Sequence, residues 1–126
     1  MGFGLGEKTM IESYKDLKVW KLSIELVKEI YLVTKQFPKN EEFGLVQQLK
    51  RAVISIPCNI AEGKTRGHRK EYIQFLYISL GSCAEVNTQL VIAFELNYIT
   101  KDVYEKLSSK VELISRMIRN LIKALK

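Results

Sequence analysis

Residues 43–71, FGLVQQLKRAVISIPCNIAEGKTRGHRKE, decide how the rest of the chain can fold. Their apolar side chains recur at alternating steps of three and four residues, which is the spacing of one face of an α-helix. This apolar stripe consists of Val46, Leu49, Val53, Ile56 and Ile60. A polar line follows another face of the same helix and consists of Gln48, Arg51, Ser55, Asn59, Glu62 and Arg66. The stripe predicts a helix that faces a core, and the polar line is either a solvated or packed face or a ligand-binding one.

Pro57 lies in the middle of this helical pattern. It cannot donate a hydrogen bond to the carbonyl of Val53, and a proline inside a helix costs about 3 kcal/mol. One interpretation ends the helix near Ile56 and starts another with Pro57 in its first turn. The other is a single helix with a kink, which we favour because both faces stay in phase across the proline. We expect Gly63 to end this helix in a left-handed conformation.

The segment that follows, KTRGHRK at residues 64–70, carries four formal positive charges in seven residues. Such a segment can lie along a phosphate backbone, and a solvated turn between helices is the alternative. His68 has no second histidine and no cysteine at ligand spacing, so no metal site is predicted. The candidate nucleic-acid contacts from this segment and from the helix before it are Lys50, Arg51, Lys64, Arg66, Arg69 and Lys70.

Amphipathic spacing elsewhere predicts three further helices, which gives helices at about 14–36, 41–63, 69–98 and 101–124. Long helices joined by short connections favour an antiparallel up-down-up-down four-helix bundle. The predicted fold class is therefore all-α, with a single domain over residues 1–126 and the second helix kinked at Pro57. We expect Asn40 to cap the second helix and residues 1–12 to be flexible.

The third helix is apolar on nearly all of its sides, which predicts burial by more than one partner and self-association. Gly81 and its small neighbours would let another helix approach closely. Glu85 lies in this apolar segment, and a buried carboxylate needs a partner. Arg51 is the candidate partner, and simple exposure of Glu85 is the alternative. In the fourth helix the outer face is basic towards its end, which complements the negative end of the helix dipole.

The composition limits the function further. The net charge is +6 and the isoelectric point about 9.3, which favours an acidic partner such as nucleic acid or an anionic membrane, although solubility alone also explains it. Cys58 and Cys83 lack a CxxC spacing, and we expect both to be buried, reduced thiols.

Without a signal peptide or an apolar run of about 18 residues, we expect a cytoplasmic protein that does not bind membranes. No nucleophile, base and oxyanion donor occur together, so no catalytic residue, metal or cofactor is predicted, and the chain is not expected to be an enzyme.

Several motifs occur together in this chain: LKVW at 17–20, FP at 37–38, QLKRA at 48–52, SIPCNIAEG at 55–63, and GS at 81–82 with Glu85. With these motifs the chain resembles the four-helix-bundle proteins encoded in intervening sequences of bacterial 23S rRNA genes. The structural signature residues are Trp20, Ser55, Pro57, Asn59, Glu62, Gly63, Gly81 and Glu85. The chain departs from this family at Cys58, where alanine is usual, and at His68, where serine is frequent.

The resemblance implies a homopentamer without enzyme activity, metal or cofactor, and an association with rRNA that rests on gene position. The fold is shared with the accessory protein of diversity-generating retroelements, which binds nucleic acid and a reverse transcriptase. We therefore expect a non-enzymatic homo-oligomer that binds the phosphate backbone of RNA or DNA through a basic surface. The alternative is a protein-interaction scaffold, or an accessory factor for a reverse transcriptase.

Overall fold

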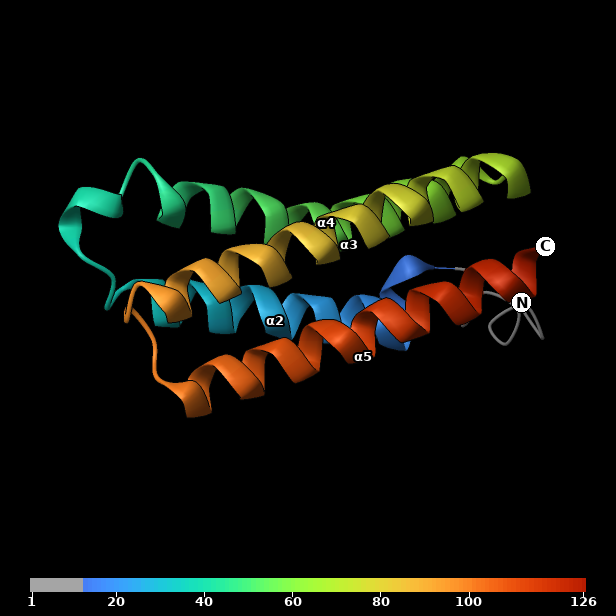
Figure 1. Cartoon of the computed structure of the whole chain (residues 1–126). Coiled ribbons are helices and arrows are strands. Elements are labelled where there is room, and N and C mark those ends of the chain that lie inside the picture. Colours follow the sequence, from blue (N-terminus) through green and yellow to red (C-terminus); the bar gives the residue numbers. More distant parts are fainter. Residues whose placement is uncertain (1–12) are drawn as a thin grey trace.

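Four long helices make up most of residues 13–126, which are the part of the chain that the computed structural model describes (Figure 1). They are α2 (Lys18–Thr34), α3 (Leu45–Arg66), α4 (Arg69–Glu95) and α5 (Lys101–Leu125). Two short 3-10 helices, η1 (Tyr14–Asp16) and η2 (Lys39–Glu41), precede α2 and α3. The prediction of an all-α four-helix fold is confirmed. Consecutive helices run in opposite directions in Figure 1, which is consistent with the up-down-up-down order. The expectation for residues 1–12 lies outside the described residues.

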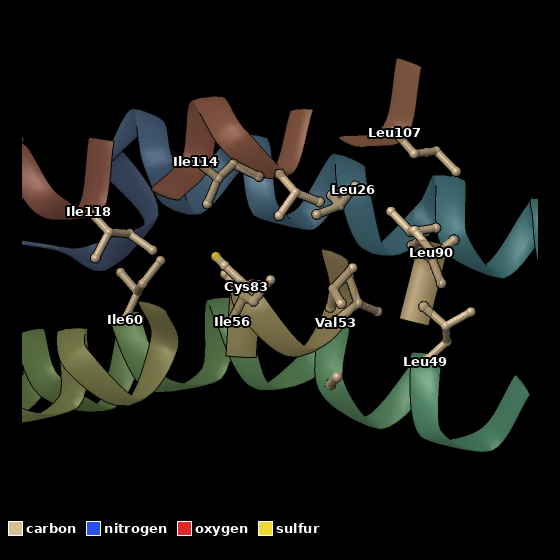
Figure 2. Packing of buried hydrophobic residues seen from close by; sticks show 14 of the residues in the cluster. Leu26, Leu49, Val53, Ile56, Ile60, Cys83, Leu90, Leu107, Ile114 and Ile118 are labelled. Atoms are coloured by element: carbon tan, nitrogen blue, oxygen red, sulfur yellow. The ribbon is translucent and has the colours of Figure 1, made fainter. Parts of the chain in front are cut away.

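The core is built from the apolar stripes of all four helices (Figure 2). The stripe predicted in residues 43–71 is buried along its whole length, because Val46, Leu49, Val53, Ile56 and Ile60 are all at most 8% exposed. The same core contains side chains from the other helices, all fully or almost fully buried, which include Leu26, Leu76, Leu90, Ile114 and Ile118. The 3-4 spacing of the sequence therefore identified the core face of α3 correctly.

Pro57 lies inside one continuous helix, α3, as the second of the two interpretations predicted. Its side chain is buried. The prediction that Gly63 ends this helix is wrong, because Gly63 is buried within α3 and the helix continues to Arg66. A Cβ atom at position 63 would lie 2.8 Å from Cβ of Phe75 on α4. Gly63 therefore allows α3 and α4 to approach closely. The left-handed residue comes four positions later, at Gly67, where φ is 77° and glycine is favoured.

The start of α3 also differs from the prediction. Asn40 does not cap it, because residues 39–41 form η2 and α3 begins only at Leu45. The carboxylate of Glu41 takes the capping role, since its Oε1 accepts a hydrogen bond from the backbone N–H of Leu45 at 3.2 Å. The other oxygen of Glu41 accepts from the hydroxyl of Tyr98 at 2.7 Å. This hydrogen bond, with burial and the charge of Glu41, raises the pKa of Tyr98. The start of α3 is thus fixed to the segment that follows α4.

The two cysteines differ in their surroundings, and both are free thiols. Cys83 is buried, as expected, and burial raises the pKa of its thiol. Cys58 is exposed, so the prediction of a buried thiol is wrong at this position. The reason is its place on the helix. Cys58 follows Ile56 by two residues, which is about 200° around the helix axis and therefore on the outer side.

Helix α4 carries large apolar side chains on its buried face and also on its exposed faces. Its core positions are buried, but several large apolar side chains of the same helix and its C-terminal end are exposed to solvent: Tyr77, Ile78, Val91, Ile92 and Leu96, with exposed fractions from 41% to 51%. The helix ends at Glu95, three residues before the predicted end. A turn follows, in which Asn97 adopts a positive φ of 64°.

Candidate nucleic-acid interface

The positive charge of the bundle is concentrated towards one end. With each helix divided at its midpoint, residues 13–26, 56–82 and 113–126 form the half that contains the α3–α4 connection. This basic half holds eleven Lys and Arg residues against four Asp and Glu, which is a net charge of +7. The remaining residues, 27–55 and 83–112, form a neutral half with eight residues of each sign. Among the described residues, the excess of positive charge therefore lies entirely in the basic half.

The α3–α4 hairpin places four of the six candidate contacts in the basic half. The predicted basic turn is mostly helical: Lys64 and Arg66 lie in the last turn of α3, and Arg69 and Lys70 in the first turn of α4. Only Gly67 and His68 lie between the two helices. Arg69 and Lys70 are exposed. Because these helices hold the cations at a fixed spacing, the cations form a more ordered surface than the turn expected from the sequence.

Two cations of the hairpin, Lys64 and Arg66, lie close to other side chains of the same chain. Arg66 donates to Oε2 of Glu62 at 2.9 Å, and its guanidinium lies 5.1 Å from the ring centre of Phe75. The hydrogen bond to Glu62 raises the pKa of Arg66. The ammonium of Lys64 lies 5.9 Å from the ring centre of Tyr72. Arg66 therefore has a carboxylate beside it, whereas Arg69 and Lys70 are in no ion pair in the described part of the chain.

The other two candidates, Lys50 and Arg51, lie in the neutral half. They are 13 or more residues before Lys64 on the same helix, which corresponds to about 20 Å along its axis. The ammonium of Lys50 lies 4.6 Å from the ring centre of Tyr31 on α2. The structure thus separates the six candidates into a hairpin group of four and a second group of two.

Arg51 lines a small polar cleft between α3 and α4. The cleft has a volume of about 180 Å³ and is lined by Gln48, Arg51, Ala52, Ser55 and Glu85. The suggested ion pair does not form, because Arg51 and Glu85 are not among the salt bridges of residues 13–126. Glu85 is exposed, which was the alternative.

Further along α3, the polar line packs against α4 by hydrogen bonds. The hydroxyls of Ser55 and Ser82 lie 2.8 Å apart. The amide of Asn59 donates to the backbone oxygen and to the hydroxyl of Ser55, both at 2.8 Å. Ser79 on α4 donates to the backbone oxygen of Ile56 at 2.9 Å. Ser55 and Asn59 therefore belong to a hydrogen-bonded contact between neighbouring helices. Of the remaining signature residues, Trp20 packs partly buried against the core and Gly81 is exposed.

The sequence did not identify the basic residues of α5 as part of a site. Arg116, Arg119, Lys123 and Lys126 are exposed and lie in the basic half. In the sequence they are about 50 residues from the hairpin, and the helix dipole was a sufficient explanation for them. Their periodic spacing was the available signal. Only the fold shows that the end of α5 lies at the same end of the bundle as the α3–α4 connection (Figure 1).

Residues 13–126 lack the features of two other kinds of site. No group of three or more His, Cys, Asp or Glu side chains in this range could hold a metal ion. None of its helices is long and apolar enough to cross a membrane.

These features define a class of protein, an all-helical four-helix bundle with its excess positive charge at one end. The family of the 23S rRNA-intervening sequence protein matches residues 15–120, and the chain belongs to this family. The resemblance found in the sequence motifs is therefore confirmed. A similar structure is the 1.70 Å crystal structure of a protein of unknown function from the S23 ribosomal protein family of Bacteroides thetaiotaomicron VPI-5482. Its TM-score is 0.75 and its sequence identity 27%, over 83% of this chain and 98% of that one. No curated protein matches the chain.

Proposed function

We propose that this protein is a non-enzymatic homo-oligomer that binds RNA or DNA through phosphate contacts on its basic half. The observation that carries the proposal is the division of charge, with +7 on the basic half and zero on the neutral half. A surface with one sign of charge attracts a polyanion and raises its rate of association. The name of the family, which refers to 23S rRNA, supports RNA as the first nucleic acid to test.

The hairpin group supplies the contacts in this proposal. Lys64, Arg69 and Lys70 are not in salt bridges in the described part of the chain, whereas Arg66 is bound to Glu62. Contacts of this kind position a nucleic acid without reading its sequence. Binding should therefore tolerate many sequences and weaken steeply as the salt concentration rises.

Salt dependence tests the proposal. We expect the affinity for a fluorescein-labelled RNA to fall linearly with salt on logarithmic axes. Replacing Lys64, Arg69 and Lys70 with glutamine should reduce the slope by about 2 to 3, since each phosphate contact contributes about 0.7 to 0.9. The measurement is fluorescence anisotropy over a series of salt concentrations.

A matched variant uses three exposed lysines of the neutral half, Lys28, Lys35 and Lys106, each replaced with glutamine. It should keep the wild-type slope. A double variant, Lys50→Gln with Arg51→Gln, shows whether the second group of candidates also contacts phosphate. The proposal fails if wild-type binding is absent or insensitive to salt. It also fails if the two triple variants lower the slope equally.

Self-association is the second part of the proposal, and it is supported by the exposed apolar side chains of α4. Ile78 and Ile92 are 51% and 42% exposed. Gly81 lies between them along the helix, and a Cβ atom there would meet no other atom of the chain within 4 Å. Exposed large apolar side chains favour an interface, and a glycine lets a second helix come close. The exposed polar residues Glu85 and Thr88 lie between Ile78 and Ile92 on this face. A homopentamer is the assembly that the family resemblance implies.

We expect the double variant Ile78→Glu with Ile92→Glu to shift the protein from an oligomer to a monomer, because it places charges in the proposed interface. The measurement is light scattering coupled to size-exclusion chromatography. The control is Leu32→Glu on α2, since Leu32 is 61% exposed and lies outside α4. A monomeric wild-type protein would contradict this part of the proposal.

The same surface of α4 favours a second candidate function. If the wild-type chain is monomeric and does not bind nucleic acid, these apolar residues would instead bind a different protein. The scaffold or accessory role for a reverse transcriptase is that alternative. A pull-down with a purified reverse transcriptase after nuclease treatment tests this alternative. The double variant Ile78→Glu with Ile92→Glu should then lose the interaction.

A further inference from the structure

The seam between α4 and the last part of α5 is a second cationic surface in the basic half. Two contacts fix how the helices lie along each other. The ammonium of Lys126 donates to the hydroxyl of Tyr77 at 3.2 Å, and the amide of Asn87 donates to Oε2 of Glu112 at 3.1 Å. Residues 112–126 of α5 therefore run beside residues 77–87 of α4. We call this surface the α4–α5 seam, and its members are Tyr77, Arg116, Arg119, Lys123 and Lys126.

Three of the four cations of the seam, Arg119, Lys123 and Lys126, have no acidic residue within four positions of them in the sequence. Residues 72–84 and 113–126 contain no Asp or Glu. The carboxylate that comes before them on α5, Glu112, accepts a hydrogen bond from the amide of Asn87 at 3.1 Å. Burial raises the pKa of the Cys83 thiol, and the charges of Arg119 and Glu112 act on this pKa in opposite directions. Glu112 lies one helical turn before Arg116 and lines the same surface depression. The seam thus carries four cations and one carboxylate at its edge, which leaves it with a net positive charge.

The helix dipole explains only part of this arrangement. Its influence is confined to about the last turn, whereas Arg116 and Arg119 lie nine and six residues before the end of α5 at Leu125. The four cations follow one another at steps of three, four and three residues, so each is the neighbour of the next on the helix surface. Like charges at these spacings destabilise a helix. An external polyanion would remove this repulsion.

An exposed aromatic ring lies beside one of these charges. Tyr77 is 48% exposed, and the ammonium of Lys126 lies 5.7 Å from the centre of its ring. Cationic surfaces that carry exposed aromatic rings suit single-stranded nucleic acid, because unpaired bases can stack on the rings. A duplex keeps its bases stacked inside and cannot use such a ring in the same way. The ring therefore favours a single strand over a duplex.

We propose that the α4–α5 seam binds single-stranded nucleic acid, with phosphates on Arg116, Arg119, Lys123 and Lys126 and one base stacked on Tyr77. This inference rests on the proposed function. It adds a second surface to the hairpin contacts and specifies the strandedness of the ligand.

The test compares binding of a labelled oligouridine and of a labelled RNA duplex to the full chain. Replacing Arg116, Arg119 and Lys123 with glutamine should lower the salt slope for oligouridine by about 2, at about 0.7 for each contact with a single strand. Tyr77→Leu should weaken oligouridine binding by about 5- to 150-fold, which corresponds to the usual value of a stacked base. Tyr77→Phe keeps the ring and loses only the hydroxyl that Lys126 contacts, so it should bind almost as the wild type does.

The neutral half offers a matched control, because it also contains a tyrosine with a lysine over its ring. Tyr31 is 37% exposed, and the ammonium of Lys50 lies 4.6 Å from its ring centre. Tyr31→Leu should leave oligouridine binding unchanged. Circular dichroism confirms that each variant is folded, which is expected because the replaced side chains are exposed or partly exposed.

The outcomes separate this inference from the proposed function. If the wild-type protein binds no nucleic acid, both are wrong. If the hairpin variant loses affinity and the seam variants do not, only the seam inference is overturned. Equal loss in Tyr77→Leu and Tyr31→Leu, or tighter binding of the duplex than of oligouridine, also overturns it. So does binding of the seam to phosphatidylserine vesicles without any binding of oligouridine.

Discussion

Replacing Lys64, Arg69 and Lys70 with glutamate should weaken RNA binding by about a thousandfold at moderate salt. The substitutions change the net charge of the basic half from +7 to +1, because each reverses one charge. Each lost contact between a cation and a phosphate is worth about 1.5 kcal/mol or more, and three of them correspond to about three factors of ten in affinity. Arg66 is kept, because a glutamate there would repel Glu62, its present partner.

Binding of labelled RNA, measured by anisotropy or gel mobility at constant salt, checks this expectation. The matched control replaces Lys28, Lys35 and Lys106 of the neutral half with glutamate, which changes the total charge of the chain by the same amount. If both variants weaken binding equally, the effect comes from net charge alone. The position of the charges would then be irrelevant, and the basic half would not be the binding surface.

Gly63→Val should lower the free energy of unfolding by about 1–3 kcal/mol or more, the usual effect of overpacking a well-packed interior. The added Cβ atom would lie 2.8 Å from Cβ of Phe75, 3.1 Å from the ring of Tyr72 and 3.3 Å from the backbone oxygen of Tyr72. Two of these three atoms are backbone or directly attached to it, so they cannot move without shifting α4. The two helices would have to separate.

The measurement for Gly63 is urea or thermal unfolding followed by circular dichroism. Thr65→Val is the matched control, because Thr65 also lies in α3 but is exposed to solvent. Valine and threonine have similar helix propensities, so this variant should be about as stable as the wild type. A Gly63→Val protein as stable as the wild type would contradict the close contact between α3 and α4.

The helices and the core could be predicted because their signal is periodic and local. The stripe from Val46 to Ile60 was identified correctly, and so was the continuity of α3 through Pro57, because apolar spacing at steps of three and four is a property of a single helix. The helix ends were less predictable. The sequence predicts a helix end at Gly63, because glycine often terminates helices. In the structure, position 63 needs a glycine because Phe75 on α4 approaches it closely.

The prediction of the residue that caps α3 was wrong for the same reason, because the deciding partner is distant in the sequence. Asn40 is a good cap by residue type, but Glu41 takes that role, and the hydroxyl of Tyr98 holds its second oxygen. Tyr98 is 57 residues away in the sequence. Capping preferences depend on residue type near the helix end, so they cannot predict a partner that is distant in the sequence.

The candidate site shows the difference between sequence and structure most clearly. A basic cluster of adjacent residues at 64–70 was visible in the sequence, and the structure confirms only its place at the junction of α3 and α4. The division of the chain into a basic half and a neutral half depends on how four helices are arranged in space. It separates Lys50 and Arg51 from the hairpin and adds Arg116 and Arg119 to the same end of the bundle.

The most direct test of RNA binding by the basic half is ultraviolet cross-linking of the wild-type protein to RNA, followed by mass spectrometry of the modified peptides. We predict nucleotide adducts within residues 56–82 and 113–126, with Tyr77 as an expected position. Adducts confined to residues 27–55 and 83–112 would place the RNA on the neutral half and contradict the proposed function.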